Sequence, residues 1–428
     1  MDVFVARQPI FDLRTRVVGY ELLHRSGTQN RYLGPDAVTA TRQLLAEQLL
    51  SDNWYRLTSG RPAWVNFPGE LILDGSATLV PPERMVVELL ESIVVNDAVL
   101  AACEDLEDRG YVLAADDVSD PEDTNPLLDL VEIIKVDFRV ASQAQRAALA
   151  ERFAGRARLV AEKVETRAEQ AAAIDLGYDL LQGYFLREPA MVAKRSLDQT
   201  RLGVLAALAA VSRTPMDYEE VEQAVKQEIA LTDKLLRYLN SAVFGWQARV
   251  TSIRSALVAL GEKQIRRWVS VVAVSSVAVD RPPELIASAL IRARMCEQIA
   301  EAHAVHTPYL DLFLTGLYSQ MHLLMDMDLE TTMAEAPVPE IVRDALLGRS
   351  GPLWNALDLV VAWEAGDWDR VVAAAGTLDV PLDSLPGWYA DALAFADALG
   401  GADHDAAHHH DDPGQAPVGV GGASRAGG

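Results

Sequence analysis

Two adjacent aspartates, Asp116 and Asp117, end the apolar run "YVLAADD", and Lys135 lies in the next run, "EIIKVDF". Five further apolar runs each carry one polar residue that their neighbours do not explain. These residues are Glu21 in "YELL", Asn66 in "VNF", Glu88 in "VVELL", Glu162 in "VAEKVE" and Gln182 in "LLQGY". One such residue would be a helix cap or a loop residue, but a series of them in consecutive runs indicates a shared site.

Carboxylates grouped in this way need a counter-charge. Two of them 4 Å apart repel by about 4 kcal/mol at an effective dielectric constant near 20. A divalent cation reverses this cost, and Asp, Glu and Asn oxygens are suitable ligands for Mg²⁺, Mn²⁺ or Ca²⁺. We therefore predict a metal-binding site.

The runs that carry these residues alternate with helical patterns from Met1 to about Pro189, for example at 96–110 and 142–155. Strands separated by helices pair in parallel, because parallel strands need a crossover. At least seven strands favour a TIM-like (β/α) barrel, in which sites form at the C-terminal ends of the strands. An open doubly wound sheet is the alternative, but neither GxGxxG nor GxxxxGK occurs.

Beyond Pro189 the strand pattern gives way to a 3.6-residue apolar period. We predict an α/β barrel domain at 1–193, an all-helical domain at 196–400 and a disordered tail at 401–428. The tail is polar and rich in Gly and Ala, so it cannot bury a core. Its three consecutive histidines are interpreted as solvated residues.

Composition limits the partners and the compartment. The 62 acidic residues outnumber the 38 basic ones, and the net charge of −24 disfavours nucleic acid and anionic membranes. There is no run of about 18 apolar residues and no signal-like start, so no membrane span is expected. Only Cys103 and Cys296 are present, as expected for a cytoplasmic protein with free thiols.

The N-terminal part resembles the EAL domain of bacterial cyclic-di-GMP phosphodiesterases. The similar motifs are "ARQPIFDLRTRVVGYELLHR", with "ELL" in place of the signature "EAL", then the asparagine in "VNF", "ELLES", the aspartate pair, "KVD", "AEKVE" for "AEGVE", and "QGYFLREP". They occur in the family's order over about residues 3–189.

The resemblance implies a two-metal site holding Mg²⁺ or Mn²⁺. It implies that Lys135 positions the attacking water and that Glu162 assists proton transfer. One ion would be held by Glu21, Asn66, Glu88 and Asp116, and Asp117 would help to hold the second. The residues implied to contact cyclic-di-GMP are Gln8, Arg25 and Gln182.

One loop departs from the family pattern. Active members follow the aspartate pair with "DDFGTGYSS", whereas this chain has "DDVSDPEDTNP", which lacks glycine and contains Pro121. Three further acidic residues, Asp120, Glu122 and Asp123, add negative charge beside the expected phosphate site. We therefore expect ligand binding with little or no turnover.

The helical part resembles the HDOD domain, a relative of HD phosphohydrolases that lacks their metal ligands. The segments that carry this resemblance are 235–245 and 252–269. Where HD enzymes have adjacent His and Asp, this chain has Ser319 and Gln320 in "GLYSQM". We interpret the nearby histidines as core or surface residues: His303, His306 and His322.

Together the two parts resemble EAL–HDOD signalling proteins, and three functions follow as hypotheses. The first is a signalling protein whose barrel binds cyclic-di-GMP with metal and whose helical domain binds a protein partner. The second is an active phosphodiesterase that yields linear pGpG, and the third is a scaffold that binds no nucleotide. The first is preferred, with a homodimer as a possible assembly.

Overall fold

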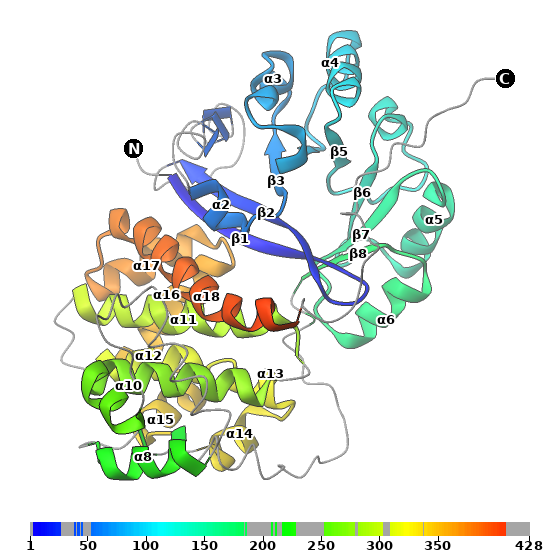
Figure 1. Ribbon diagram of the computed structural model, residues 1–428. Coiled ribbons are helices and arrows are strands. Elements are labelled where there is room, and N and C mark those ends of the chain that lie inside the picture. The colour runs from blue at the N-terminus through cyan, green and yellow to red at the C-terminus, as the bar shows by residue number, and fades with distance from the viewer. Residues whose placement is uncertain are drawn as a thin grey trace.

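The computed structural model describes residues 3–26, 53–183, 216–227, 252–278, 281–302, 309–336 and 338–407, and a few residues within 38–45, at 185 and within 207–211. The N-terminal part is a closed eight-stranded barrel, and the C-terminal part is helical (Figure 1). This confirms the predicted fold class. The predicted domain limit near 193–196 lies outside the described residues and remains a prediction. Of the predicted tail at 401–428, residues 401–407 are helical, and the rest lies outside the described residues.

The barrel strands follow one another around the barrel in chain order. They are β1 (Val3–Asp12), β2 (Val17–Ser26), β3 (Ala63–Phe67), β4 (Met85–Leu89), β5 (Val112–Ala115), β6 (Ile133–Asp137), β7 (Arg158–Glu162) and β8 (Leu180–Gln182).

Strand β1 was not predicted from the sequence, and it pairs antiparallel with both β2 and β8. The strands from β2 to β8 are parallel. The connection from Asp12 to Val17 is too short for a crossover, so it forms a hairpin. Its turn is held by the Asp12 carboxylate, which accepts hydrogen bonds from the backbone N–H groups of Arg14 and Arg16.

Side chains in the barrel interior form layers, because successive residues of a strand point to opposite faces. Seven strands contribute one buried apolar residue each to an inner layer: Ile10, Trp64, Val86, Ala114, Ile133, Val160 and Leu180. On β2 the equivalent position is Gly19, where a Cβ atom would lie 2.5 Å from Nε1 of Trp64. The absence of a side chain there makes room for the indole.

The polar residues singled out in the sequence lie two positions from this apolar layer. Asn66, Glu88, Asp116, Lys135, Glu162 and Gln182 each follow their strand's apolar residue by two, and Glu21 follows Gly19 by two. On the antiparallel β1, Gln8 precedes Ile10 by two. The pleat of the barrel therefore turns all eight strands' polar residues to one end of the interior.

Short helices separate the parallel strands. They are α2 (Asn53–Thr58), α3 (Gly69–Leu73), α4 (Asp97–Asp108), α5 (Gln143–Phe153) and α6 (Arg167–Asp175). Asn96 caps α4, and capping boxes begin at Ser142 for α5 and at Thr166 for α6.

The helical part contains α8 (Tyr218–Gln227), α10 (Ile253–Val277), α11 (Pro283–Ala302), α12 (Tyr309–Tyr318), α13 (Met321–Met325), α14 (Leu329–Glu335), α15 (Glu340–Gly348), α16 (Gly351–Glu364), α17 (Trp368–Leu378) and α18 (Leu385–Ala407). Helix α10 is interrupted at Gly261, whose φ is 71°. Among the described helices, none is long and apolar enough to cross a membrane.

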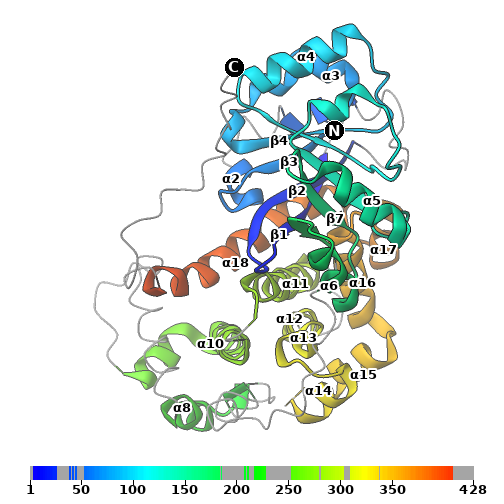
Figure 2. The same cartoon turned by 90° about the vertical axis from the view of Figure 1, so that its right-hand side faces the viewer.

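The helical part packs against the outer face of β1 and β2, through α11, α16 and α18 (Figures 1 and 2). Phe4 of β1 meets Trp363 of α16 edge to face, with ring centroids 5.8 Å apart. The two thiols contribute to packing: Cys103 and Cys296 are buried and free, and burial raises their pKa to about 11 and about 12. The barrel and the helices thus share a continuous apolar core.

Candidate functional site

Lys135 lies at the centre of the polar layer, with its side chain 1% exposed. Its Nζ contacts one oxygen of each of four carboxylates that come from four different strands. The distances are 2.7 Å to Glu88, 2.8 Å to Glu162, 3.0 Å to Asp116 and 3.4 Å to Glu21. The chain therefore brings together four of the predicted acidic residues around one ammonium group.

Two of the three predicted amide side chains donate hydrogen bonds to Glu21. Nε2 of Gln182 donates to Oε2 of Glu21 at 2.6 Å, and Nδ2 of Asn66 donates to Oε1 of Glu21 at 3.3 Å. Gln8 is half-buried and lies opposite Glu21 in the β1–β2 pairing. Arg25 is in β2, four residues beyond Glu21, but its side chain lies outside the described residues.

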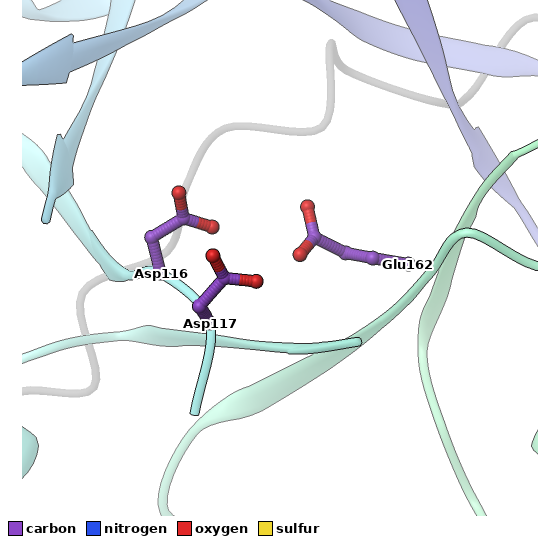
Figure 3. Close-up of side chains that lie close together, drawn as sticks. All are labelled: Asp116, Asp117 and Glu162. Atoms are coloured by element: carbon purple, nitrogen blue, oxygen red, sulfur yellow. The ribbon is translucent and has the colours of Figure 1, made fainter. Parts of the chain in front are cut away.

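Asp116 and Glu162 of the layer form a group with Asp117, whose side chain is 45% exposed. Each offers a carboxylate oxygen, and these three oxygens lie within 4.8 Å of one another. Figure 3 shows the two aspartates at the end of β5 and Glu162 facing them from β7. Asp117 has a φ of 51°, a left-handed conformation that aspartate tolerates better than most residues. In the described part of the chain, this is the one group of three or more such side chains that could hold an ion.

Burial and mutual repulsion shift the pKa values of these groups. Burial, together with the charge of Glu21, raises the pKa of Glu88 well above its usual value. Burial raises the pKa of Glu162 to about 8. Burial opposes the charged form of Lys135, but the surrounding carboxylates outweigh it and raise the pKa of this ammonium. The site therefore favours a bound proton or a cation over free carboxylates.

Two buried oxygens in this layer suit a metal ion. Oδ1 of Asn66 and Oε2 of Glu88 are buried and accept no hydrogen bond from the described residues. Buried acceptors without a partner are costly, and a coordinated cation would remove that cost. Together with the carboxylates of Asp116, Asp117 and Glu162, these oxygens make a donor set that fits hard divalent ions.

The loop after Asp117 is held to helix α5 by side-chain contacts. Nη1 of Arg152 donates to the carbonyl of Pro121 at 2.8 Å, and its Nη2 donates to the carbonyl of Asp123 at 2.6 Å. Gln145 donates to the carbonyl of Ser119 at 3.1 Å. The loop that follows the aspartate pair is therefore held in place at Ser119, Pro121 and Asp123.

The positions that carry metal ligands in HD enzymes have a structural role here. Oγ of Ser319 donates to the carbonyl of Gly316 and lies 3.2 Å from Nη1 of Arg292. Gln320 is buried, and its Nε2 donates to Ser288 at 2.7 Å. His322 is half-buried in α13, whereas His303, His306 and the segment 235–245 lie outside the described residues.

Two charged residues beside the site were not identified from the sequence. Asp137 ends β6 and is 4% exposed, and Lys163 directly follows Glu162. Nζ of Lys163 lies 2.5 Å from Oδ2 of Asp137 and 3.8 Å from Oδ1 of Asp117. The available signal was in "AEKVE", where a lysine stands at the glycine of the family's "AEGVE".

Comparison with known proteins gives two family matches. Residues 65–189 match the EAL domain and residues 203–338 match the HDOD domain. The chain is 33% identical over 374 residues to the cyclic di-GMP phosphodiesterase CdgJ of Vibrio cholerae, which covers 86% of each chain. It is 31% identical over 388 residues to the uncharacterized protein YuxH of Bacillus subtilis, which covers 89% of this chain and 95% of YuxH.

Among solved structures, a calcium and cyclic-di-GMP complex of BlrP1 from Klebsiella pneumoniae is similar to 43% of this chain. The match covers 55% of the BlrP1 chain at 20% sequence identity, with a TM-score of 0.36.

Proposed function

Since the chain belongs to the family of proteins in which an EAL domain precedes an HDOD domain, we propose that it acts in cyclic-di-GMP signalling. In this proposal the barrel binds cyclic-di-GMP together with divalent metal and turns it over slowly or not at all. The helical domain transmits the bound state to a protein partner.

The convergence of the polar layer around Lys135 is the observation that carries the proposal. Four carboxylates lie within 3.4 Å of its Nζ. Three buried oxygens of the layer, Oδ1 of Asn66, Oε2 of Glu88 and Oε1 of Gln182, accept no hydrogen bond from the described residues. An interior this rich in acid is unfavourable unless cations enter it. The arrangement is more than a stable barrel requires, because apolar side chains would fill the same space at lower cost.

In the proposed complex Glu21, Asn66, Glu88 and Asp116 hold one divalent ion, and Asp117 helps to hold a second. Mg²⁺ or Mn²⁺ would neutralise the phosphodiester and lower the pKa of a bound water. Lys135 orients the water by donating from Nζ, and Glu162 accepts a proton at its carboxylate. Gln8, Arg25 and Gln182 contact the nucleotide.

The loop after the aspartate pair is the reason for proposing slow turnover. Its sequence adds acidic residues beside a phosphate site, and Arg152 fixes two of its carbonyls. In-line hydrolysis needs reacting groups in fixed positions, and a misplacement of about 1 Å can cost on the order of 100-fold in rate. A loop of different sequence that is fixed to α5 in this way would hold Asp117 in a position other than the one that the glycine-rich loop provides.

Binding is tested by calorimetry on the full chain with cyclic-di-GMP in the presence of Mg²⁺, Mn²⁺ or Ca²⁺. We expect a dissociation constant in the micromolar range or below with metal, and weaker binding after treatment with a chelator. No heat with any of the three ions at high protein concentration would favour the scaffold function instead.

An active phosphodiesterase is the second candidate, favoured by 33% identity to CdgJ over 86% of both chains. Incubation with cyclic-di-GMP, followed by chromatography of linear pGpG, distinguishes this candidate from a slow or inactive binding protein. We expect conversion far below that of relatives with an intact glycine-rich loop, restricted to Mn²⁺ or Mg²⁺ and abolished by Glu21→Ala. Fast, Glu21-dependent conversion would establish the phosphodiesterase, and conversion that survives Glu21→Ala would indicate a contaminant.

For the helical domain we propose protein recognition without metal chemistry, because Ser319 and Gln320 make hydrogen bonds within the fold. A homodimer is part of the same proposal, with light scattering as its test. The full chain carrying Glu21→Ala should retain no stoichiometric iron and hydrolyse no cyclic nucleotide. Stoichiometric iron in this variant would contradict the proposal for the helical half, whereas hydrolysis alone would again indicate a contaminant.

A further inference from the structure

Lys163 places a second positive charge at the edge of the carboxylate group. Its Nζ lies 3.8 Å from Oδ1 of Asp117, and its side chain is 47% exposed. The group formed by Asp116, Asp117 and Glu162 is therefore flanked by two ammonium groups. Lys135 contacts it from the barrel interior, and Lys163 contacts it from the rim.

The position of the Lys163 ammonium is fixed by Asp137. Oδ2 of Asp137 lies 2.5 Å from Nζ, and Oδ1 accepts a hydrogen bond from the backbone N–H of Arg139 at 2.7 Å. The Asp137 carboxylate is almost completely buried, so it has little access to water as an alternative partner. Removing a lysine from such a carboxylate is costly, which holds the ammonium beside Asp117.

The backbone contributes to the same placement. Lys163 has a φ of 53°, a left-handed conformation that most residues with a side chain avoid. Lysine is not among the residues that favour this conformation, so surrounding contacts must maintain it. The ion pair with Asp137 is one such contact, and it joins the end of β6 to the end of β7.

We propose that Lys163 is a built-in counter-cation that weakens the binding of a divalent ion at Asp117. This inference rests on the proposed metal-binding function and concerns the relative affinity of its two ions. A metal beside Asp117 would compete with the Lys163 ammonium for the same carboxylate. Of the proposed metal ligands, Asp117 is the one that forms an ion pair with Lys163, so Lys163 should lower mainly the affinity for the second ion.

The test is Mn²⁺ calorimetry on the chelator-treated full chain, with stoichiometry and affinity as readouts. We expect the wild type to bind one ion tightly and a second at least about tenfold more weakly. Lys163→Gln removes the charge but keeps a donor for Asp137, and it should tighten the second ion about tenfold. Lys163→Arg keeps the charge and should leave both affinities at the wild-type values.

Lys226→Gln provides a matched control, because Lys226 is 48% exposed and its Nζ lies 2.6 Å from Oε1 of Glu222 in α8, outside the barrel. It should change neither ion. Electron paramagnetic resonance at two equivalents of Mn²⁺ adds a second readout: a spin-coupled pair should form more completely in Lys163→Gln than in the wild type.

If every variant still binds Mn²⁺ but Lys163→Gln binds the second ion no more tightly than the wild type does, the inference is refuted and the proposed function stands. Equal affinity for two ions in the wild type would do the same. If thermal denaturation shows that all variants are folded and none of them binds Mn²⁺, both this inference and the proposed metal-binding function are refuted.

Discussion

At the scale of single residues, the site is defined by competition between buried charges. Glu162 and Lys135 lie 2.8 Å apart, yet burial keeps the pKa of Glu162 at about 8. The pKa of Asp137 moves the other way: burial opposes ionisation, but hydrogen bonds from Lys163 and the backbone of Arg139 lower it. One acid therefore tends to hold a proton, and the other stays charged.

Glu162 should make the metal-free protein less stable as pH rises. Its pKa of about 8 in the folded state exceeds the usual 4.5, so between these values the folded state holds the extra proton. The free energy of unfolding therefore falls as pH rises. The contribution of Glu162 is fully present below about pH 4.5 and is lost as pH rises through about 8, on the order of 1 kcal/mol per pH unit.

The measurement is urea denaturation of the wild type and Glu162→Gln from pH 5 to 8, with chelator present. Other titrating groups are shared by the two proteins, so the difference isolates Glu162. The stability of Glu162→Gln relative to the wild type should increase across this range. A constant difference would mean that Glu162 is already ionised at pH 5.

At the scale of elements, the barrel positions its polar layer through the apolar layer beneath it. Trp64 fills the interior next to β2 only because Gly19 has no side chain. Asn66 follows Trp64 by two residues on the same strand, and Glu21 follows Gly19 by two. The packing of the Trp64 indole therefore helps to set the positions of Asn66 and Glu21 in the site.

Gly19→Ala should destabilise the protein by about 1–3 kcal/mol, because the new Cβ would lie 2.5 Å from Nε1 and 2.9 Å from Cδ1 of Trp64. Chemical denaturation measures the change. The matched control is Gly376→Ala in α17, where nothing lies within 4 Å of the added atom. That substitution should be neutral or stabilising by about 0.5–1 kcal/mol. Equal effects at both positions would show that the interior near Trp64 can relax.

At the scale of the whole molecule, the helical domain contacts the strands that carry Glu21 and Gln8. Oε2 of Glu284, in the first turn of α11, accepts a hydrogen bond from the hydroxyl of Tyr20 at 2.9 Å. Its Oε1 lies 3.9 Å from Nη2 of Arg7. Tyr20 and Arg7 are the immediate neighbours of Glu21 and Gln8, on the opposite face of the strands.

A cavity of about 90 Å³ adjoins this contact, lined by Gln8 and Gly183 of the barrel and by Ser288 and Tyr389 of the helical domain. Arg7 extends the connection, because its Nη1 donates to Oγ of Ser59 at 2.9 Å, and Ser59 donates to Oδ1 of Asp397 in α18 at 3.2 Å. The two domains therefore meet through a buried polar network as well as an apolar interface.

Glu284→Ala should lower the free energy of unfolding by about 3 kcal/mol, because it leaves buried Arg7 and Tyr20 without their shared partner. Glu284→Gln keeps an acceptor for Tyr20 and should cost less. Urea denaturation followed by tryptophan fluorescence and by far-ultraviolet circular dichroism gives both values. Equal losses in the two variants would assign the effect to the ion pair with Arg7, because both substitutions remove the charge of Glu284. No loss in either would mean that the network adds nothing to stability.

The sequence by itself determined the fold class and the identity of the polar layer. Short apolar runs and a 3.6-residue apolar period distinguished the barrel from the helices, and the polar residues in these runs marked Glu21, Asn66, Glu88, Asp116, Lys135, Glu162 and Gln182. These features are local, because each depends on neighbours within one strand or helix. The antiparallel β1 was not recognised, since Arg7, Gln8 and Pro9 interrupt its apolar pattern.

Only the tertiary structure decided which charges are neighbours. Lys135 lies among four carboxylates because strand tilt and register carry its long side chain across the barrel. Lys163 meets Asp137 because β6 and β7 pair with Asp137 opposite Glu162. Glu284 meets Tyr20 across 264 residues of sequence. Such contacts depend on the closure of the barrel and the docking of the helices, and no local pattern encodes a distance between segments that meet only in the folded chain.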